Sequence, residues 1–349
     1  MNKNIKFDFD DILIVPEVTT NITSRYKDIK LPSKLPLFTA PMDTVVNLDN
    51  VKEFVRHGIH VCLPRTVPFL NELYLLTELT GNIFPSIGIT NVDRLIAHDW
   101  LLKSFSNLLI DVANGHMNII LDKCKRIKEI NPLIKIMVGN IANPETYKVY
   151  AKSNLVDYVR IGIGNGGGCL TTKQSGIGYP MASLISEIRE IKVTLANEGH
   201  DNLPAIIADG GMKDYADVVK ALALGADYVM LGSILNKALE SAGDNYYRNK
   251  NISSEKAKKL FMNGKKIEKY FRGMSTKSAQ KAMGNDEFKT SEGVERFRPV
   301  EYTLERWVEN FEHYLRNAMS YSNAKTLNDF IGKVEIIQIT NRAYDRFNK

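Results

Sequence analysis

Residues 162–180, GIGNGGGCLTTKQSGIGYP, contain the side chains of this sequence best suited to covalent chemistry. The stretch holds seven glycines, a density that neither a helix nor a strand tolerates, so we predict an irregular loop. Cys169 lies in its middle, whereas Cys62 lies in an apolar run typical of a structural cysteine. A flexible loop would let the Cys169 thiolate reach an electrophile, and Thr171 could orient a leaving group or water. The residues alone leave two interpretations open, a covalent nucleophile and a passive loop cysteine.

Two glycine-containing turns suggest a phosphate site. Gly210 and Gly211 end one apolar run, and Gly232 with Ser233 ends the next. Turns of this kind present backbone N–H groups that bind phosphate. Asp209 precedes the first turn, where a carboxylate can accept both hydroxyls of a ribose. These residues favour a nucleoside monophosphate or a sugar phosphate as ligand.

Short runs that are apolar on both faces would position these turns. The eight runs are 35–42, 59–64, 84–89, 107–113, 134–141, 158–164, 205–211 and 227–233. Such runs are typical of buried parallel strands, and helical stretches lie between most of them. Eight successive β/α units predict an α/β fold, a closed (β/α)₈ TIM barrel, with an open eight-stranded sheet as the alternative.

Polar residues follow several of these strands, where a barrel carries its active site. Asp43, Asp111, Asn114 and Asn140 occupy such positions, as Asp209 does. Because Asn and Asp also mark ordinary turns, each position alone is weak support. Their recurrence at one end of so many strands favours a functional site.

The segment 242–300 interrupts the pattern after the last strand and is polar and rich in lysine. We predict a β-hairpin over 258–271 around Asn263-Gly264, followed by a glycine turn and a helix start. A long insert on the active face is often a flap. Lys256, Lys258, Lys259, Lys265 and Lys266 form either a solvated face or a phosphate contact. Residues 301–349 predict a helix, a second short helix and a strand, all within one domain over 1–349.

Composition excludes several classes of protein. The chain has 349 residues, 44% hydrophobic and 25% charged, which is ordinary for a globular protein with a sizeable core. A net charge of +6 gives no clear nucleic-acid signature. Cys62, Cys124 and Cys169 form neither a disulfide framework nor a zinc pattern. With no apolar run long enough to span a bilayer and no signal core, we expect a soluble cytoplasmic protein.

The motifs in order resemble the IMP dehydrogenase/GMP reductase family over nearly the whole chain. They are FDFDDILIVPEVTTNITSR, APMDTV, GIGNGGGCLTT, GIGYP, IIADGG, DVVKALALGADYVMLGS and FRGMS. The resemblance implies a (β/α)₈ barrel, a homotetramer, a catalytic cysteine on a mobile loop and a potassium ion on that loop's carbonyls. CLPRTVPFLNELYLLTELTGN runs on without the regulatory CBS insert that most dehydrogenases carry.

Within the family, the sequence favours a GMP reductase. Dehydrogenases hydrolyse their intermediate with an Arg-Tyr pair in the flap, and TKSAQKAMGNDEFK has none. IDVANGH, GIGYP and FKTSEG at 288–293 are similar to reductase motifs. APMD, GS and FRGM are closer to the dehydrogenase form, so an IMP dehydrogenase without the insert (IMP to XMP with NAD) remains an alternative. A divergent purine-nucleotide-binding paralogue without catalysis is another.

The resemblance also implies roles for individual residues in converting GMP to IMP and ammonia with NADPH, through a Cys169 thioimidate. The implied catalytic residues are Cys169, Thr171 and Glu292. Substrate contacts are implied for Asp209 (ribose), Gly210, Gly211, Gly232 and Ser233 (phosphate), and Gly273, Met274, Ser275, Ser291 and Gly293. Dinucleotide contacts are implied for Ser24, Arg25, Asp111, Val112, Ala113, Ile163, Gly164 and Lys289. Potassium would bind the carbonyls of Gly164, Gly166 and Cys169.

The cysteine loop departs from the family pattern GPGSxCTT. Asn165 replaces a proline, and Gly167 replaces a serine that normally binds phosphate. Thr172 replaces an arginine that frames the potassium site, and Lys289 replaces a flap arginine. We therefore expect a looser loop, a phosphate site without the serine hydroxyl and a weaker requirement for potassium. The chain is a divergent member whose substrate could be another purine nucleotide.

Overall fold

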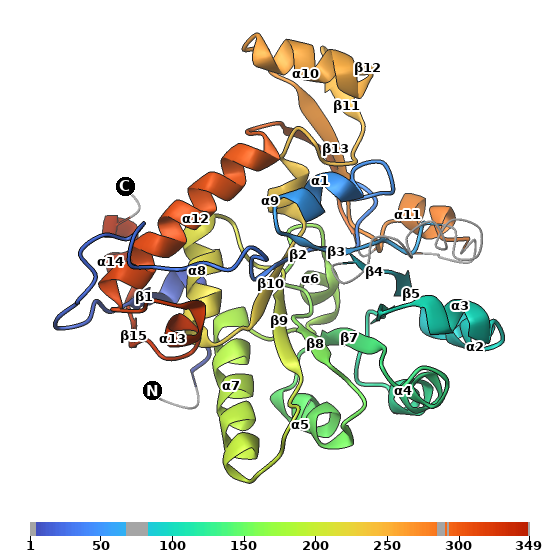
Figure 1. Cartoon of the computed structure of the whole chain (residues 1–349). Helices are drawn as coiled ribbons and strands as arrows, with labels where there is room; N and C mark the ends of the chain where they lie inside the picture. Colours follow the sequence, from blue (N-terminus) through green and yellow to red (C-terminus); the bar gives the residue numbers. More distant parts are fainter. Residues whose placement is uncertain (1–4, 68–82, 285–289, 292, 348–349) are drawn as a thin grey trace.

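A computed structural model describes residues 5–67, 83–284, 290–291 and 293–347 of the chain (Figure 1). Its centre is a parallel sheet with the strand order β4-β3-β2-β10-β9-β8-β7-β6-β5. The strands are β2 Leu37–Thr39, β3 His60–Cys62, β4 Ile83–Phe84, β5 Ser86–Ile87, β6 Asn107–Asp111, β7 Lys135–Ile141, β8 Tyr158–Ile161, β9 Ala205–Asp209 and β10 Tyr228–Leu231.

The two outer strands of this order, β4 and β5, are a single stretch of chain interrupted at Pro85. Val61 of β3 pairs with Ile83, and Leu109 of β6 pairs with Ser86, so the stretch joins both edges of the sheet. The Leu109 amide donates to the Pro85 carbonyl at 2.8 Å and continues the ladder across the interruption. Each of the eight predicted strands is present, and the predicted barrel is confirmed.

Alternate residues of each strand point into the barrel, because successive side chains of a strand face opposite sides. At the amino end, Phe38 stacks on His60 with ring centroids 4.8 Å apart. Phe84, Tyr158 and Tyr228 surround Phe38 with their rings edge-on to it. This group, called the aromatic layer below, closes the amino end of the barrel. The other end is left for smaller and charged side chains.

Helices cover the outside of the barrel (Figure 1). The longer ones are α4 Ile119–Ile130, α5 Pro144–Ser153, α7 Met181–Asn197 and α8 Tyr215–Leu224, and the shorter ones are α1 Val51–Arg56, α2 Val92–Ile96 and α3 Asp99–Ser104. Side-chain caps fix two of the starts. Asn143 accepts the Glu145 amide at 3.0 Å, and Asp214 accepts the Asp217 amide at 3.1 Å. These caps fix where α5 and α8 begin after the preceding strand ends.

The chain ends pack together on one side of the barrel. The N-terminal strand β1 (Ile12–Ile14) pairs antiparallel with β15 (Ile336–Gln338). Helix α12 (Leu304–Tyr321) lies against α8, and Trp307 stacks on Tyr215. The predicted C-terminal helix, short helix (α13, Leu327–Phe330) and strand are confirmed. Helix α14 (Asn341–Phe347), which the sequence pattern did not predict, follows them.

The insert forms a four-stranded antiparallel sheet of order β12-β11-β13-β14. This sheet projects from the barrel together with helix α10 (Figure 1). Its elements are β11 Asn245–Tyr247, β12 Lys250–Ile252, α10 Ser254–Met262, β13 Glu268–Arg272, α11 Lys277–Ala282 and β14 Glu295–Pro299. The helix start after the glycine turn is confirmed as α11. Strand β14 was not predicted from the sequence.

The predicted β-hairpin over 258–271 is wrong. Ser253 caps α10 by accepting the Lys256 amide at 3.3 Å, and the helix continues to Met262. Gly264 has a φ of 71°, and the Lys265 amide donates to the Leu260 carbonyl, so Asn263-Gly264 ends a helix. The same dipeptide that favours a hairpin turn therefore closes a helix here.

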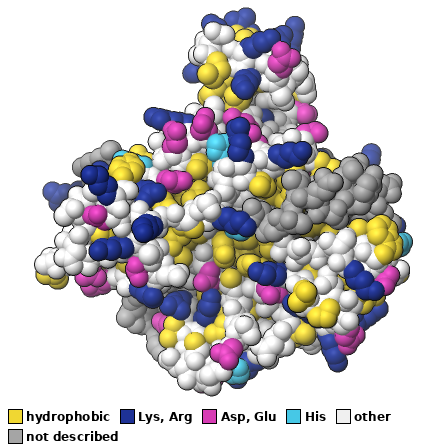
Figure 2. Space-filling model, viewed as in Figure 1, with side chains coloured by type: hydrophobic (Ala, Val, Ile, Leu, Met, Phe, Trp, Pro, Cys, Tyr) yellow, Lys and Arg dark blue, Asp and Glu magenta, His cyan; other side chains and the backbone are white. Residues whose placement is uncertain are grey.

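Five lysines of the insert, Lys256, Lys258, Lys259, Lys265 and Lys266, are exposed and none of these lines the cavity described below, which agrees with a solvated face. Figure 2 shows Lys and Arg side chains gathered toward the tip of the projecting insert. Among the described residues, no helix combines the length and the apolar character needed to cross a membrane.

Candidate active site

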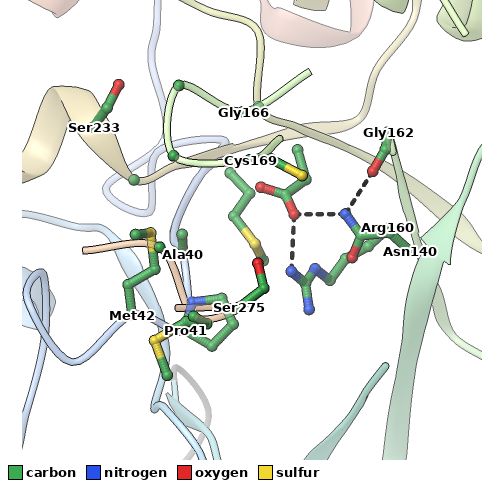
Figure 3. A pocket seen from close by; sticks show the side chains of 18 of the residues that line it. Ala40, Pro41, Met42, Asn140, Arg160, Gly162, Gly166, Cys169, Ser233 and Ser275 are labelled. Carbon is green, nitrogen blue, oxygen red and sulfur yellow. Dashed lines mark hydrogen bonds and ion pairs between the residues drawn. The ribbon is translucent and has the colours of Figure 1, made fainter. Parts of the chain in front are cut away.

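A cavity of about 280 Å³ opens at the carboxyl end of the barrel, where the sequence predicted the site. Its walls come from the ends of β2, β6, β7, β8, β9 and β10, from the cysteine loop and from the start of the insert. Predicted site residues that line it are Asp111, Val112, Ala113, Ile163, Gly164, Gly166, Cys169, Thr171, Asp209, Gly210, Gly211, Gly232, Ser233, Gly273, Met274 and Ser275. Side chains from many strands thus converge on one space (Figure 3).

Cys169 is partly exposed at the wall of this cavity. Its Sγ lies 3.2 Å from Thr171 Oγ1. The Cys169 amide donates to the Gly166 carbonyl at 2.9 Å, which folds the glycine segment into a turn. Thr171 begins a short helix, α6 (Thr171–Ser175), so the predicted irregular loop contains one helical turn over residues without glycine. The loop places a thiol and a hydroxyl side by side against the cavity.

The other two cysteines lie in a different environment. Cys62 and Cys124 are buried. Burial raises the pKa of the Cys62 thiol far above its ordinary value and that of Cys124 to about 12. Because the thiolate is the nucleophile, neither buried thiol is available for attack at neutral pH. Cys169 alone among the three combines access with a neighbouring hydroxyl.

Arg160 connects two acidic residues beneath the cavity. Its Nη1 lies 2.6 Å from Asp111 Oδ1, and its Nη2 lies 2.8 Å from Asp209 Oδ2. Asn140 Nδ2 also donates to Asp209 Oδ2 at 2.7 Å and to the Gly162 carbonyl at 2.8 Å (Figure 3). One Asp209 oxygen is therefore held by two donors. This geometry fixes the carboxylate at the wall of the cavity.

Arg65 completes the network, with its Nε 3.0 Å from Asp111 Oδ2. Burial by itself would raise the pKa of Asp111, but the charges of Arg160 and Arg65 outweigh it and hold the pKa below the ordinary value. Sequence reasoning missed both arginines. A lone arginine within the apolar run YVRIGIG, at a position facing the barrel interior, was the available signal for Arg160.

The two predicted phosphate turns face the cysteine loop. Gly210 and Gly211 have φ values of 87° and 88°, a conformation that glycine adopts without strain. A Cβ on Gly210 would lie 3.0 Å from the Gly166 backbone. Ser233 begins the short helix α9 (Ser233–Asn236). Gly210 thus allows the backbone of its turn to approach the cysteine loop closely, and the Ser233 side chain lies near Gly167 of the same loop.

The insert closes part of the cavity with Gly273, Met274 and Ser275. Gln280 Nε2 donates to the Met274 carbonyl at 2.8 Å. Gly293 pairs with Cys169 in an isolated antiparallel bridge, and Ser291 Oγ donates to the Gly293 carbonyl at 3.1 Å. The predicted residues Lys289 and Glu292 lie outside the described residues. The flap therefore contacts the cysteine loop directly.

Ser24 and Arg25 do not line the cavity. The Ser24 amide donates to Asp28 Oδ2 at 2.9 Å, and Arg25 Nη1 donates to Asn317 Oδ1 on α12 at 2.9 Å. Their contact with a dinucleotide stays a prediction that this single chain does not test. Asp111, Val112 and Ala113, by contrast, reach the cavity together from the end of β6.

Comparison with known proteins agrees with this geometry. The IMP dehydrogenase / GMP reductase domain matches residues 86–346. A GMP reductase of Onchocerca volvulus is 28% identical, covering 98% of this chain and 93% of that protein. A GMP reductase of Buchnera aphidicola is 29% identical and GMP reductase 2 of Homo sapiens 27%, with 98% and 99% of those proteins covered. The chain belongs to the IMP dehydrogenase / GMP reductase family.

Proposed function

We propose that this chain is a GMP reductase, which converts GMP to IMP and ammonia with NADPH. The observation that carries the proposal is the Cys169 thiol, 3.2 Å from the Thr171 hydroxyl, in a cavity that also holds Asp209 and the glycine turns. Several relatives that match nearly the whole chain are named GMP reductase. The family is one of oxidoreductases that use a nicotinamide cofactor and bind purine nucleotides.

In the proposed complex, the backbone N–H groups of the glycine turns bind the nucleotide phosphate, with Ser233. Asp209 accepts the ribose hydroxyls through the oxygen that Arg160 and Asn140 leave free. The purine lies over Met274 and Ser275, and its C2 atom faces Cys169. Further base contacts fall to Gly273, Ser291, Glu292 and Gly293. The pairing of Gly293 with Cys169 supports this placement, because it brings the flap to the nucleophile.

The proposed reaction starts when the Cys169 thiolate adds to C2 of GMP and forms a C–S bond. Thr171 and Glu292 deliver a proton to the 2-amino group, which leaves as ammonia and gives a thioimidate. NADPH supplies a hydride to C2 when bound. The C–S bond then breaks, the thiolate is regenerated and IMP leaves. This chain's residues thus position C2, hold the thiolate and move the proton.

We place the dinucleotide beside the purine, at the end of β6 and the start of the cysteine loop. Asp111, Val112, Ala113, Ile163 and Gly164 would contact it, with Ser24, Arg25 and Lys289 as further predicted contacts. Two arginines neutralise Asp111, so its carboxylate does not repel an anionic cofactor. Apolar Val112 and Ala113 suit the nicotinamide face.

We also propose a potassium ion on the carbonyls of Gly164, Gly166 and Cys169. Carbonyl oxygens are hard ligands of the kind that such a cation prefers, and all three belong to the cysteine loop. The Gly166 carbonyl already accepts the Cys169 amide, but a second lone pair is available. A single domain over 1–349 with a flap at 242–300, a homotetramer and a cytoplasmic location complete the proposal.

One assay panel tests the function. GMP and IMP are each supplied with NADPH, NADH, NADP or NAD, with and without potassium. We expect loss of absorbance near 340 nm with GMP and a reduced cofactor, and equal amounts of IMP and ammonia. Absorbance gained from IMP and NAD, with XMP formed and no turnover of GMP, would instead show an IMP dehydrogenase, as the APMD and FRGM motifs favour. No turnover with any pair would support the non-catalytic paralogue.

A further inference from the structure

Two arginines of β14 share one face of the insert sheet. Because side chains alternate along a strand, Arg296 and Arg298 point the same way, and Phe297 points to the other side. Both guanidinium groups lie over the ring of Phe271, 5.4 and 5.3 Å from its centroid. Phe271 is buried and lines the cavity. Neither arginine is among the residues that line the cavity, but both lie directly against its wall at Phe271.

One arginine reaches the cysteine loop, and the other reaches the phosphate turn at Ser233. Arg296 Nη2 donates to the Gly167 carbonyl at 3.1 Å, and Arg298 Nη1 donates to the Ser233 carbonyl at 3.1 Å. Gly167 has no side chain, and the space that its Cβ would fill is bordered by two polar groups. Arg296 Nη2 lies 3.6 Å and Ser233 Oγ 3.8 Å from that point. The guanidinium and the hydroxyl therefore converge beside the glycine turns.

The charged side chains that line the cavity supply no net positive charge for an anionic ligand. The charged side chains known to line it are Arg65, Asp111, Arg160 and Asp209, whose formal charges cancel. Within the described part of the chain, neither Arg296 nor Arg298 has a carboxylate within 4.0 Å. Burial, and next the charge of Arg296, lower the pKa of Arg298. Two adjacent cations that form no ion pair among the described residues, beside turns rich in N–H groups, favour the binding of an anion.

We propose that Arg296 and Arg298 bind the phosphate of the nucleotide that occupies this cavity and supply the positive charge that its glycine turns lack. The inference rests on the proposed function only in placing a nucleoside monophosphate here. Arg296 lies nearer the open space at Gly167 and contacts the phosphate oxygens directly. Arg298 holds the Ser233 turn and adds charge behind it. The ligand class is a phosphomonoester dianion.

The test compares nucleotides with their nucleosides. Dissociation constants are measured by calorimetry for GMP and guanosine and for IMP and inosine, with the full chain and with Arg296→Gln and Arg298→Gln. A lost charged hydrogen bond predicts a loss of about 10- to 100-fold in nucleotide affinity for Arg296→Gln, and a smaller loss for Arg298→Gln. Nucleoside affinity should change by less than about twofold. Arg306→Gln, an exposed arginine of α12, is the matched control and should change neither.

Lysine variants keep the test valid if a glutamine variant does not fold. Arg296→Lys retains the charge and should retain more nucleotide affinity than Arg296→Gln, again with nucleoside affinity unchanged. Equal losses for nucleotide and nucleoside, or no loss for either, would overturn the inference and leave the arginines as supports of two backbone turns. A chain that binds IMP through Arg296 but does not reduce GMP would refute the proposed function and leave this inference intact.

Discussion

The two ends of the barrel are built from the same strands but hold opposite kinds of side chain. Strand β8 contributes Tyr158 to the aromatic layer. Two residues later it contributes Arg160 to the ion pairs with Asp111 and Asp209. Strand β10 likewise begins with Tyr228 and leads to the Gly232 turn. A step of two residues along a strand therefore changes a packed hydrocarbon interior into a charged cavity.

This difference separates stability from chemistry. The aromatic layer contains no ion pair among the described residues, and its contribution is burial and ring packing. The carboxyl end contains buried charges and glycine turns that position side chains around the cavity. A stable fold alone would not require them. Substitutions at the amino end should therefore change the unfolding free energy without changing turnover, whereas those at the carboxyl end should change turnover or ligand affinity, with or without a loss of stability.

The largest expected effect is the loss of turnover when Cys169 at the cavity is replaced. The matched substitution is at Cys62, which is buried inside the barrel. Cys169→Ala should lower kcat by about 10⁴- to 10⁶-fold, because it removes the proposed nucleophile. Cys62→Ala should keep turnover and lower the free energy of unfolding. Steady-state kinetics and urea denaturation measure both. A Cys169→Ala chain with unchanged function would show a binding protein, and the comparison between the ends would fail.

Arg160→Gln should have the next largest effect, since it leaves Asp111 and Asp209 without their shared buried cation. Removing one partner of such a network costs about 3–5 kcal/mol of unfolding free energy. Nucleotide affinity should also fall, because Asp209 loses one of its two donors. Denaturation and calorimetry on the same sample check both results. Arg126→Gln, at an exposed ion pair on α4, is the control and should change stability by less than about 1 kcal/mol.

Phe38→Ala tests the amino end and should lower the unfolding free energy about as much as Arg160→Gln. Phe38 is fully buried in the aromatic layer, and its truncation should lower the unfolding free energy by about 3–5 kcal/mol. At temperatures where the variant stays folded, KM and kcat should remain within about threefold of the parent. A tenfold or greater loss of kcat in the folded variant would show that the two ends are coupled.

The smallest effect is a pH dependence that differs between the ends. Burial, with the nearby charges of Lys34 and Lys135, lowers the pKa of His60 from 6.5 to about 4. Between these values the unfolded chain binds the extra proton, so stability falls as pH drops from 6.5 toward 4. The loss at pH 4.5 is about 2–3 kcal/mol for this group. Asp111 loses its contribution to stability in a different pH range. Because its pKa is lowered in the folded chain, that contribution is lost only at pH values below the ordinary pKa of an aspartate.

The His60→Gln variant isolates this contribution. The difference in unfolding free energy between parent and variant should shrink toward pH 4.5 relative to pH 7.5, as measured by urea denaturation at each pH. A difference that does not change with pH would mean that His60 titrates normally in the folded chain.

Local patterns predicted the barrel but not the insert. Each barrel strand is an apolar run of its own, and the break at Pro85 did not hide the third run. The insert was misread because Asn263-Gly264 suits either a hairpin turn or a helix end, and Ser253 decides between them from ten residues away. Strand β14 depends on pairing with β13, which no local periodicity in VERFRP reveals.

The site shows the same division. Cys169, Asp209 and the glycine turns stood out by residue type and position within single loops. Arg160 and Arg65 did not, because their role appears only when the carboxyl ends of β3, β6, β8 and β9 meet in the closed barrel. Arg296 lies more than 120 residues along the chain from the Gly167 turn that it contacts. Arg298 lies more than 60 residues from the Ser233 turn that it contacts. Residues that act through long-range pairing require the fold before their chemistry can be recognised.

The central claim is that a purine C2 atom bonded to Cys169 receives a hydride. GMP is incubated with NADPH that carries deuterium at both C4 positions, and the product is examined by mass spectrometry and NMR. The account predicts IMP with one deuterium at C2 and one ammonia released for each cofactor oxidised. Turnover of GMP that leaves C2 of the product without deuterium, or that releases no ammonia, would contradict it.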